Sequence, residues 1–95
     1  MLTFEDCLAL CNLSEEEISA IAEHEHMPDI AALEYGEYLI HSPDGELHIK
    51  RMIVEDIERS KANGNIKHVE VLESVLTRFV MTHPKLQVLL ESQVK

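Results

Sequence analysis

The sequence predicts an all-α fold, a compact bundle of about five short helices. Apolar residues recur at i, i+3 and i+4 along several stretches, which is the spacing of an amphipathic helix. Glycine and proline number three each among 95 residues, whereas a small strand-rich domain needs many turns built from them. The chain has 45% hydrophobic and 27% charged residues, an ordinary composition for a globular protein with one modest core. We therefore expect residues 1–95 to form a single all-helical domain.

Two N-cap residues mark the first helix starts, and the second of them opens a capping box. Thr3 is followed three residues later by Asp6, and Ser14 is followed by Glu17. In such a box the first side chain accepts from the backbone of the second residue, and the second side chain accepts in return. We expect the first helix to end near Asn12 and the second to begin directly after Ser14.

Proline residues predict the next boundaries. Pro28 disfavours helical geometry at the residue before it and removes a backbone donor, so the second helix should stop or kink there. Whether the helix continues across Pro28 is left open by the sequence. A third helix is expected from about Pro28 to His41. Ser42-Pro43-Asp44 is then typical of an N-cap followed by proline at the first helical position, which opens a fourth helix.

A short Asn63-Gly64-Asn65 connection follows the fourth helix. It predicts an antiparallel helix hairpin, with helices at about 43–62 and 66–82, because a helix that ends at a left-handed glycine reverses the chain. The three N-terminal helices must then cover the open side of this hairpin. Counting outward from Gly64 pairs its apolar residues as Ile57 with Leu72, Ile53 with Val75, and Ile49 with Phe79.

The net charge and the cysteines restrict the classes of function that the sequence allows. The formal charge is −10, from 18 acidic against 8 basic residues, and such a field repels nucleic acid. No apolar run approaches the roughly 20 residues that span a bilayer, and the N-terminus lacks the features of a signal peptide. Cys7 and Cys11 lie four apart in a helical pattern that does not suit a disulfide. Two free thiols favour a cytoplasmic location.

The predicted third helix carries a narrow polar stripe. Glu34, Glu37 and His41 share one side at i, i+3 and i+7, while nearly every other direction is apolar or small. Such a helix is expected to be buried on most sides, and Ala32 and Gly36 would permit close approach by another helix. The stripe is either a thin solvent-facing edge or a set of ligands that points into the bundle and binds a divalent ion.

A Glu-x-x-His pair, Glu23 and His26, lies just before Pro28. Its spacing resembles that of ferritin-like di-iron bundles, which supply further carboxylates and a second Glu-x-x-His. No second copy occurs in this chain, although a homodimer would supply one by symmetry. The alternative interpretation is a solvated helix end. The resemblance implies iron or another divalent metal, held by a set that also includes the stripe: Glu23, His26, Glu34, Glu37 and His41.

Two further titratable residues fall on apolar faces. Asp56 lies among apolar positions of the fourth predicted helix and needs a hydrogen-bond donor, for which His68 across the hairpin is a candidate. His83 lies near the end of the fifth predicted helix, where a protonated imidazole interacts favourably with the helix dipole. We interpret both histidines as structural groups rather than ligands.

No nucleophile elbow or glycine-rich phosphate loop occurs, so we expect no enzyme and no cofactor. Residues 20–30 are similar to a stretch found in small bacterial helical proteins, which implies no activity. The leading hypothesis is a non-enzymatic protein-interaction or regulatory module that self-associates as a homodimer. A metal-binding bundle is the alternative, and an acidic decoy for a nucleic-acid-binding protein is a third. The hypothesis depends on the apolar third helix and on an apolar tail after Pro84: Leu86, Leu89, Leu90 and Val94.

Overall fold

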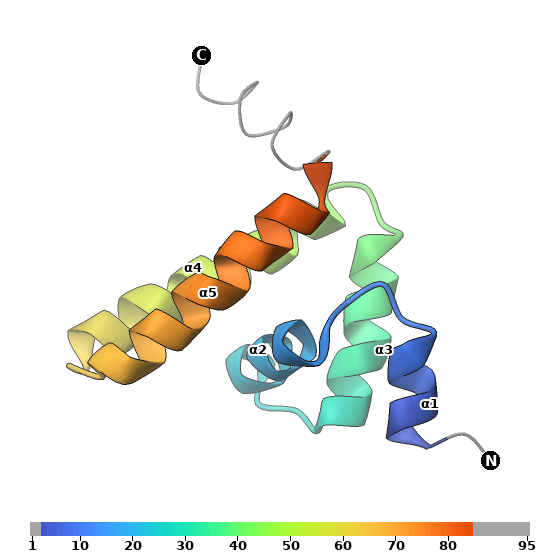
Figure 1. The fold of residues 1–95 in the computed structure, drawn as a ribbon, viewed down its shortest axis with the longest axis horizontal. Helices are drawn as coiled ribbons and strands as arrows, with labels where there is room; N and C mark the ends of the chain where they lie inside the picture. Colours follow the sequence, from blue (N-terminus) through green and yellow to red (C-terminus); the bar gives the residue numbers. More distant parts are fainter. Residues whose placement is uncertain (1–2, 85–95) are drawn as a thin grey trace.

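The computed structural model describes residues 3–84, and this part of the chain contains five α-helices and no β-strand (Figure 1). The predicted all-α fold of about five short helices is therefore confirmed. The apolar tail after Pro84, in which a last short helix was also expected at Leu86, Leu89, Leu90 and Val94, lies outside the described residues. The five helices are α1 (Phe4–Ala9), α2 (Glu15–Glu25), α3 (Asp29–Ile40), α4 (Gly45–Ala62) and α5 (Ile66–Thr82).

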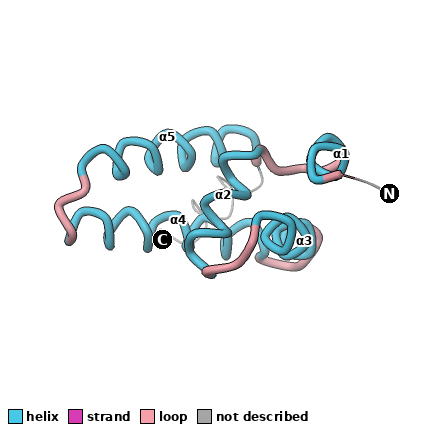
Figure 2. The backbone as a smooth tube through the Cα atoms, turned by 90° about the horizontal axis from the view of Figure 1, so that it is seen from below, coloured by secondary structure: helices cyan, strands magenta, loops and turns pink. Residues whose placement is uncertain are grey.

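α4 and α5 form the predicted antiparallel hairpin. Figure 2 shows them as two rods that run side by side from a short loop. Gly64 turns this loop with a left-handed φ of 72°, a conformation that glycine adopts without a steric penalty. The Asn65 side chain then accepts a hydrogen bond from the backbone N–H of His68 and caps α5. The six apolar residues predicted to face one another across the hairpin are all buried: Ile49, Ile53, Ile57, Leu72, Val75 and Phe79.

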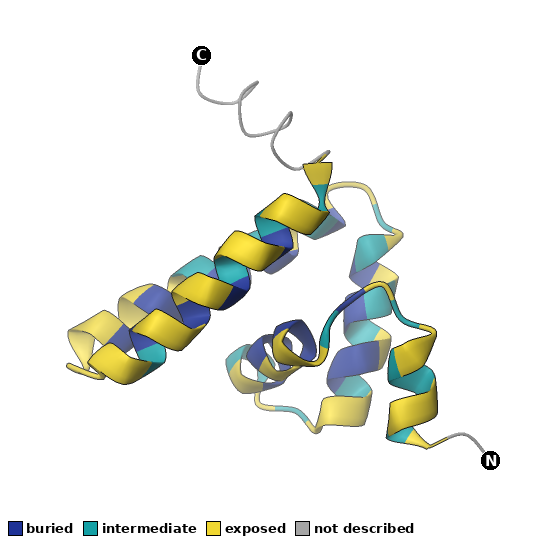
Figure 3. Cartoon of the chain, in the orientation of Figure 1, coloured by how far each residue is buried: buried dark blue, intermediate teal, exposed yellow. Residues whose placement is uncertain are grey.

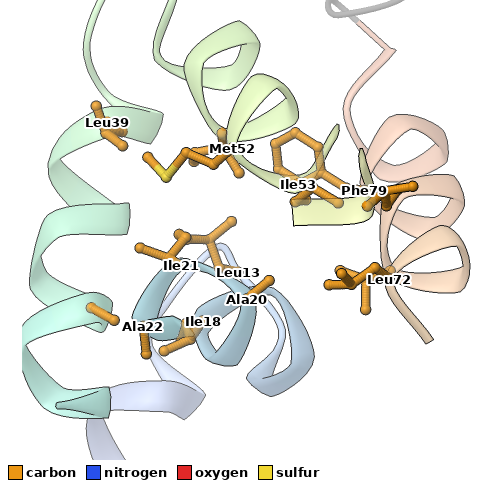
Figure 4. Close-up of a cluster of buried hydrophobic side chains, with 14 of the residues drawn as sticks. Leu13, Ile18, Ala20, Ile21, Ala22, Leu39, Met52, Ile53, Leu72 and Phe79 are labelled. Atoms are coloured by element: carbon orange, nitrogen blue, oxygen red, sulfur yellow. The ribbon is translucent and has the colours of Figure 1, made fainter. Parts of the chain in front are cut away.

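α2 lies against the hairpin and also packs on α3. Both of its expected capping bonds are present, since Ser14 N–H donates to Glu17 Oε1 at 2.9 Å and Glu17 N–H donates to Ser14 Oγ at 3.2 Å. Ile18 and Ile21 of this helix are completely buried. Figure 4 shows side chains from α2, α3, α4 and α5 converging on one hydrophobic cluster.

The helix does not continue across Pro28. α2 ends at Glu25, and His26 adopts a left-handed conformation with φ 56°. The backbone N–H of His26 still donates to Ala22 O. α3 then begins at Asp29, directly after Pro28. One helix running through Pro28 would have aligned Glu23 and His26 with the polar stripe that contains Glu34. Because the helix stops, His26 is not aligned with that stripe.

Most sides of α3 are buried or half-buried, as expected, but the side that carries Ile30, Glu34 and Tyr38 is exposed. The buried side of α3 consists of Ala32, Leu33, Gly36 and Leu39, whereas Tyr38 is 67% exposed and Ile30 is also exposed (Figure 3). α2 and α4 cover one side of α3, and the short α1, which has no fully buried residue, covers little of the rest. The predicted close approach by another helix is confirmed at Gly36, where an added Cβ would lie 3.1 Å from Ile21 Cδ1 of α2 and also 2.5 Å from Leu13 Cδ1 in the loop before that helix.

The start of α4 also differs from the sequence prediction. Ser42 does not cap α4, because its hydroxyl donates to Tyr38 O at 2.7 Å and so satisfies a carbonyl at the end of α3. Asp44 occupies the N-cap position with a left-handed φ of 61°, and α4 begins at Gly45. Pro43 therefore lies in the turn between the helices rather than in the first turn of α4.

We expect Gly45→Ala to destabilise the protein strongly. An ideal Cβ at Gly45 would lie 1.5 Å from Leu39 O and 2.3 Å from the Leu39 carbonyl carbon, and a backbone neighbour cannot rotate away as a side chain can. The free energy of unfolding should fall by at least about 2–3 kcal/mol, as in severe overpacking. Urea denaturation followed by circular dichroism measures this loss.

Gly64→Ala is the matched control. An added Cβ at Gly64 meets nothing within 4 Å, although the residue keeps its left-handed φ. This variant should lose only about 1 kcal/mol, the cost of a left-handed conformation in an L-residue with a Cβ. Equal stability of the two variants would contradict the close approach of Gly45 to α3.

Candidate interaction groove and polar cluster

Five titratable side chains meet where α2 crosses the hairpin. Glu23 and His24 come from α2, Glu55 and Asp56 from α4, and His68 from α5. Successive residues of a helix point about 100° apart, so neighbours in the sequence reach different partners. Glu23 extends to α5 while His24 extends to α4. We call these five residues the polar cluster.

His24 lies between two carboxylates. Its Nδ1 is 2.7 Å from Glu25 Oε2, and its Nε2 is 2.8 Å from Glu55 Oε1. A carboxylate accepts hydrogen bonds, so both ring nitrogens donate at once only when the imidazole is protonated. Burial lowers the His24 pKa, but the hydrogen bonds to Glu55 and Glu25 and the nearby charge of Asp56 raise it more. The pKa of His24 therefore lies above its ordinary value of 6.5.

Asp56 is a buried carboxylate whose side chain is 2% exposed. Arg59 Nη1 lies 3.4 Å from its Oδ1, but neither carboxylate oxygen accepts a hydrogen bond within the described part of the chain. Burial raises the pKa of Asp56 above its ordinary value of 3.8; the charge of His24 opposes this and that of Glu23 adds to it. The folded protein therefore favours the protonated form of Asp56 more than an unfolded chain does.

His68 does not supply the donor that the sequence suggested for Asp56. Its Nε2 lies 2.6 Å from Glu23 Oε2 and 2.9 Å from Glu23 Oε1. The Glu23 side chain is about half exposed, so its contact with His68 costs less desolvation than burying a second carboxylate would. Asp56 instead has the charges of His24 and Arg59 near it.

The structure separates the residues of the predicted metal site. Glu23 pairs with His68, His26 is exposed at the end of α2, and Glu34 is exposed on α3. Glu37 and His41 remain neighbours, with His41 Nε2 3.4 Å from Glu37 Oε2. Between residues 3 and 84, no group of three or more His, Cys, Asp or Glu side chains is placed to hold one metal ion. A site completed by a second copy stays a prediction.

Glu37, the middle residue of the polar stripe, fastens α3 to the loop after α1. The backbone N–H of Asn12 donates to Glu37 Oε1 at 2.7 Å. Asn12 lies outside α1, which ends at Ala9 rather than near Asn12 as the sequence predicted. Burial raises the Glu37 pKa, but hydrogen bonds with Cys11 and Asn12 and the neighbouring His41 lower it more. The pKa of Glu37 is therefore below its ordinary 4.5, and the carboxylate is charged near neutral pH.

Both cysteines of the chain are free, half-buried thiols. Burial and the hydrogen bond to the Glu37 carboxylate raise the pKa of Cys11 to about 11. The backbone N–H of Leu13 also donates to Cys11 Sγ at 3.3 Å. Because the thiolate is the nucleophile and the metal ligand, Cys11 is poorly suited to either role near neutral pH.

His83 is the structural group that the sequence predicted. Its Nδ1 lies 2.8 Å from Phe79 O, so the ring N–H donates to a carbonyl at the end of α5. The imidazole also stacks on the Phe79 ring with centroids 4.3 Å apart. These contacts hold the imidazole against the end of the core.

A groove runs between α2 and α5, directly beside the polar cluster. It encloses about 360 Å³, and a second hollow of about 240 Å³ continues it past Ser74 and Arg78. Val71, which is 56% exposed, contributes to both hollows. We call the two hollows together the α2–α5 groove. The lining residues of its larger part are Glu15, Glu16, Ser19, Ala20, Glu23, His68, Val71, Leu72 and Val75.

The sequence predicted neither this groove nor the contact of Glu55 with His24. One signal was available for the groove, since Val71 is out of phase with the apolar stripe of α5 that holds Val69, Leu72 and Val75. An apolar residue outside the core stripe of a helix is a candidate for an interface. Glu55 carried no comparable signal, because a glutamate on an exposed helix face is common.

No known family model matches the chain, and neither a curated protein nor a solved structure matches it. Among residues 3–84, no helix combines the length and apolar character needed to cross a bilayer. The interpretation of the groove and the polar cluster therefore depends on their geometry and chemistry.

We expect the protein to be more stable at about pH 6 than at about pH 8.5. The folded pKa of His24 is above its unfolded value, so its stabilisation is complete below about pH 6.5 and is lost as the pH rises through the folded pKa. The raised pKa of Asp56 acts in the window that begins at its ordinary value of 3.8, so the prediction for pH 6 to 8.5 depends on His24. His24→Gln should lower the free energy of unfolding by about 1–2 kcal/mol near pH 6 and flatten the pH dependence.

Urea titrations of each variant at both pH values test this expectation. His26→Asn is the control, because His26 is exposed and asparagine tolerates its left-handed backbone. This variant should keep the pH dependence of the wild type. If the free energy of unfolding of His24→Gln changed with pH as much as that of the wild type, His24 would not be the source of the pH dependence.

Cys11 should react slowly with a thiol reagent. In a Cys7→Ser variant, which leaves Cys11 alone, a pKa of about 11 against the ordinary 9.0 makes the thiolate about 100-fold scarcer near pH 8. Glu37→Gln removes the charge that helps to raise this pKa and should speed the reaction about tenfold, whereas Glu34→Gln should not. Absorbance after mixing with Ellman's reagent gives both rates, and equal rates for the two variants would rule out the contribution of Glu37.

Proposed function

We propose that this chain is a non-enzymatic protein-interaction module. The observation that carries the proposal is apolar surface left exposed along α5, at Ile66, Val71 and Met81, the last 71% exposed. Figure 3 shows the outer side of α5 as a largely exposed face. Exposed apolar side chains that gather on one element of a small domain commonly mark a binding surface.

The titratable groups support a role without catalysis. Both ring nitrogens of His24 are occupied by carboxylates, so the imidazole has no free nitrogen to accept a proton from a substrate. Asp56 is the buried member of the polar cluster. Cys11 is a protonated thiol near neutral pH because its pKa is raised. His24 and Cys11 are thus engaged by neighbouring carboxylates, and nothing in their contacts brings them to a common reaction centre.

Self-association as a homodimer is the second part of the proposal. The outer side of α5 carries Lys67 and Arg78 against Glu70 and Glu73, so its charges balance. The whole chain has a formal charge of −10, and two copies repel each other over most of their surfaces. The outer face of α5 has balanced charges and exposes apolar area, so two copies can meet there with little repulsion. Free Cys7 and Cys11 support a cytoplasmic location for the protein.

We expect a dimer with a dissociation constant of roughly 1–100 µM, because one helix face offers less area than a standard interface. Met81→Asp adds a charge to the proposed interface and should weaken the dimer at least about tenfold. Light scattering and sedimentation equilibrium over this concentration range measure the mass.

Tyr38→Asp is the matched control, because Tyr38 is about as exposed as Met81 but lies on α3. It adds the same charge and should change the dissociation constant by less than about twofold. A clean monomer at about 100 µM would count against the homodimer, and equal weakening by both variants would place the contact elsewhere.

A further inference from the structure

We propose that the α2–α5 groove binds a basic amphipathic helix supplied by another protein. The inference rests on the proposed interaction function and goes further, because it names the chemistry of the partner. The groove shares Val71 and Arg78 with the face of α5 proposed for the homodimer, but its acidic rim comes from α2, which the homodimer proposal does not use.

The floor of the α2–α5 groove is apolar. Leu72 and Val75 of α5 are buried beneath it, and Val71 rises beside them with more than half of its surface exposed. Ser19 and Ala20 on the α2 side are small, so this wall leaves room above the floor. An apolar side chain inserted here would contact all three α5 residues and remove Val71 from water, which is the driving force of helix-in-groove recognition.

The rim of the groove is acidic. Glu15, Glu16 and Glu23 line it from α2, and the first two are exposed glutamates in the first turn of that helix. His68 is a possible cation on the same rim, but it already lies 2.6 Å from Glu23 Oε2. The polar lining of this larger hollow therefore has an excess of negative charge over an apolar floor. A helix with lysine or arginine beside its apolar stripe complements both features.

A second copy of this chain fits the groove less well. With 18 acidic and 8 basic residues, a second copy would bring mostly like charge to the acidic rim, and like charges across an interface cost binding energy. Arg78, which lines the smaller hollow, marks the end of the acidic rim. The acidic character is thus confined to the part of the groove beside α2, where the partner's basic side chains would lie.

Fluorescence anisotropy with the full chain tests the proposal. The probe is a labelled synthetic peptide of about 18 residues made of leucine, lysine and alanine, with leucine on one helical face. A peptide of the same composition with leucine spread around the helix is the control. The patterned peptide should bind at least about tenfold more tightly than the control, because only it presents apolar and basic groups together.

Variants locate the binding surface. Glu16→Lys lies in both hollows and should weaken binding of the patterned peptide at least about tenfold, whereas Glu34→Lys makes the same charge change on α3 and should alter it less than about threefold. Val71→Ser should also weaken binding by about five- to tenfold, and Met81→Ser should not. Circular dichroism confirms that each variant keeps its helical content.

Each outcome decides one of the proposals. One contrary result is that Glu16→Lys and Glu34→Lys lower the affinity for the patterned peptide equally, and another is that the two peptides bind with equal affinity. Either result would show that the peptide is attracted by the net charge alone and would overturn the assignment of the groove. No binding by a chain that still dimerises would overturn the basic-helix partner and leave the interaction function standing. The dimer could also be weakened by Glu16→Lys or Val71→Ser but not by Met81→Asp. The occupant of the groove would then be a second copy of the chain, and the proposal of a basic helix from another protein would be overturned.

Discussion

The packing of α2 against α3, α4 and α5 is the contact on which the rest of the molecule depends. α2 has 11 residues, and isolated helices of that length are marginal in water. Its helical state therefore depends on burying Ile18 and Ile21, and the same burial covers the apolar side of the hairpin. The reciprocal bonds of Ser14 and Glu17 fix where the helix begins. Formation of α2 and closure of the core are in this way one coupled event.

The two distinctive surfaces of the protein both follow from the position of α2. Its C-terminal part carries Glu23 and His24 into the polar cluster, while its N-terminal part supplies the acidic wall of the groove. The cluster contains a costly group, because Asp56 is buried and accepts no hydrogen bond in the described region. Buried charged groups often set the orientation of neighbouring elements rather than adding stability. Asp56, with His24 beside it, fits that role at the crossing of α2 and α4.

Local signals predicted the parts of the structure that depend on short stretches of chain. The capping boxes at Thr3 and Ser14 and the reversal at Gly64 each involve residues within a few positions of one another, so the sequence contained what was needed. The exposure of Tyr38 was not predictable in this way. It depends on how much of α3 the other helices cover, and no helix among residues 3–84 covers Tyr38.

The functional surfaces were harder to predict for the same reason. Glu23 was assigned to a metal site from its spacing to His26, but the pairing of Glu23 with His68 links positions 45 residues apart. The groove likewise joins α2 to α5, and neither helix reveals it alone. The prediction of Ser42 as an N-cap was wrong for a local reason, since its hydroxyl can form a hydrogen bond at the end of one helix or at the start of the next. The structure assigns it to the end of α3.

The approach of Gly45 to Leu39 O limits how this fold can change over evolution. Any side chain at position 45 would push the start of α4 away from the end of α3, so natural variants that keep the fold should retain glycine there. Position 64 is more permissive, because asparagine also tolerates a left-handed backbone. Gly45, three residues after Ser42, is therefore the position at which we expect related sequences with this fold to differ least, because its requirement comes from the backbone of α3 rather than from a side chain that another residue could replace.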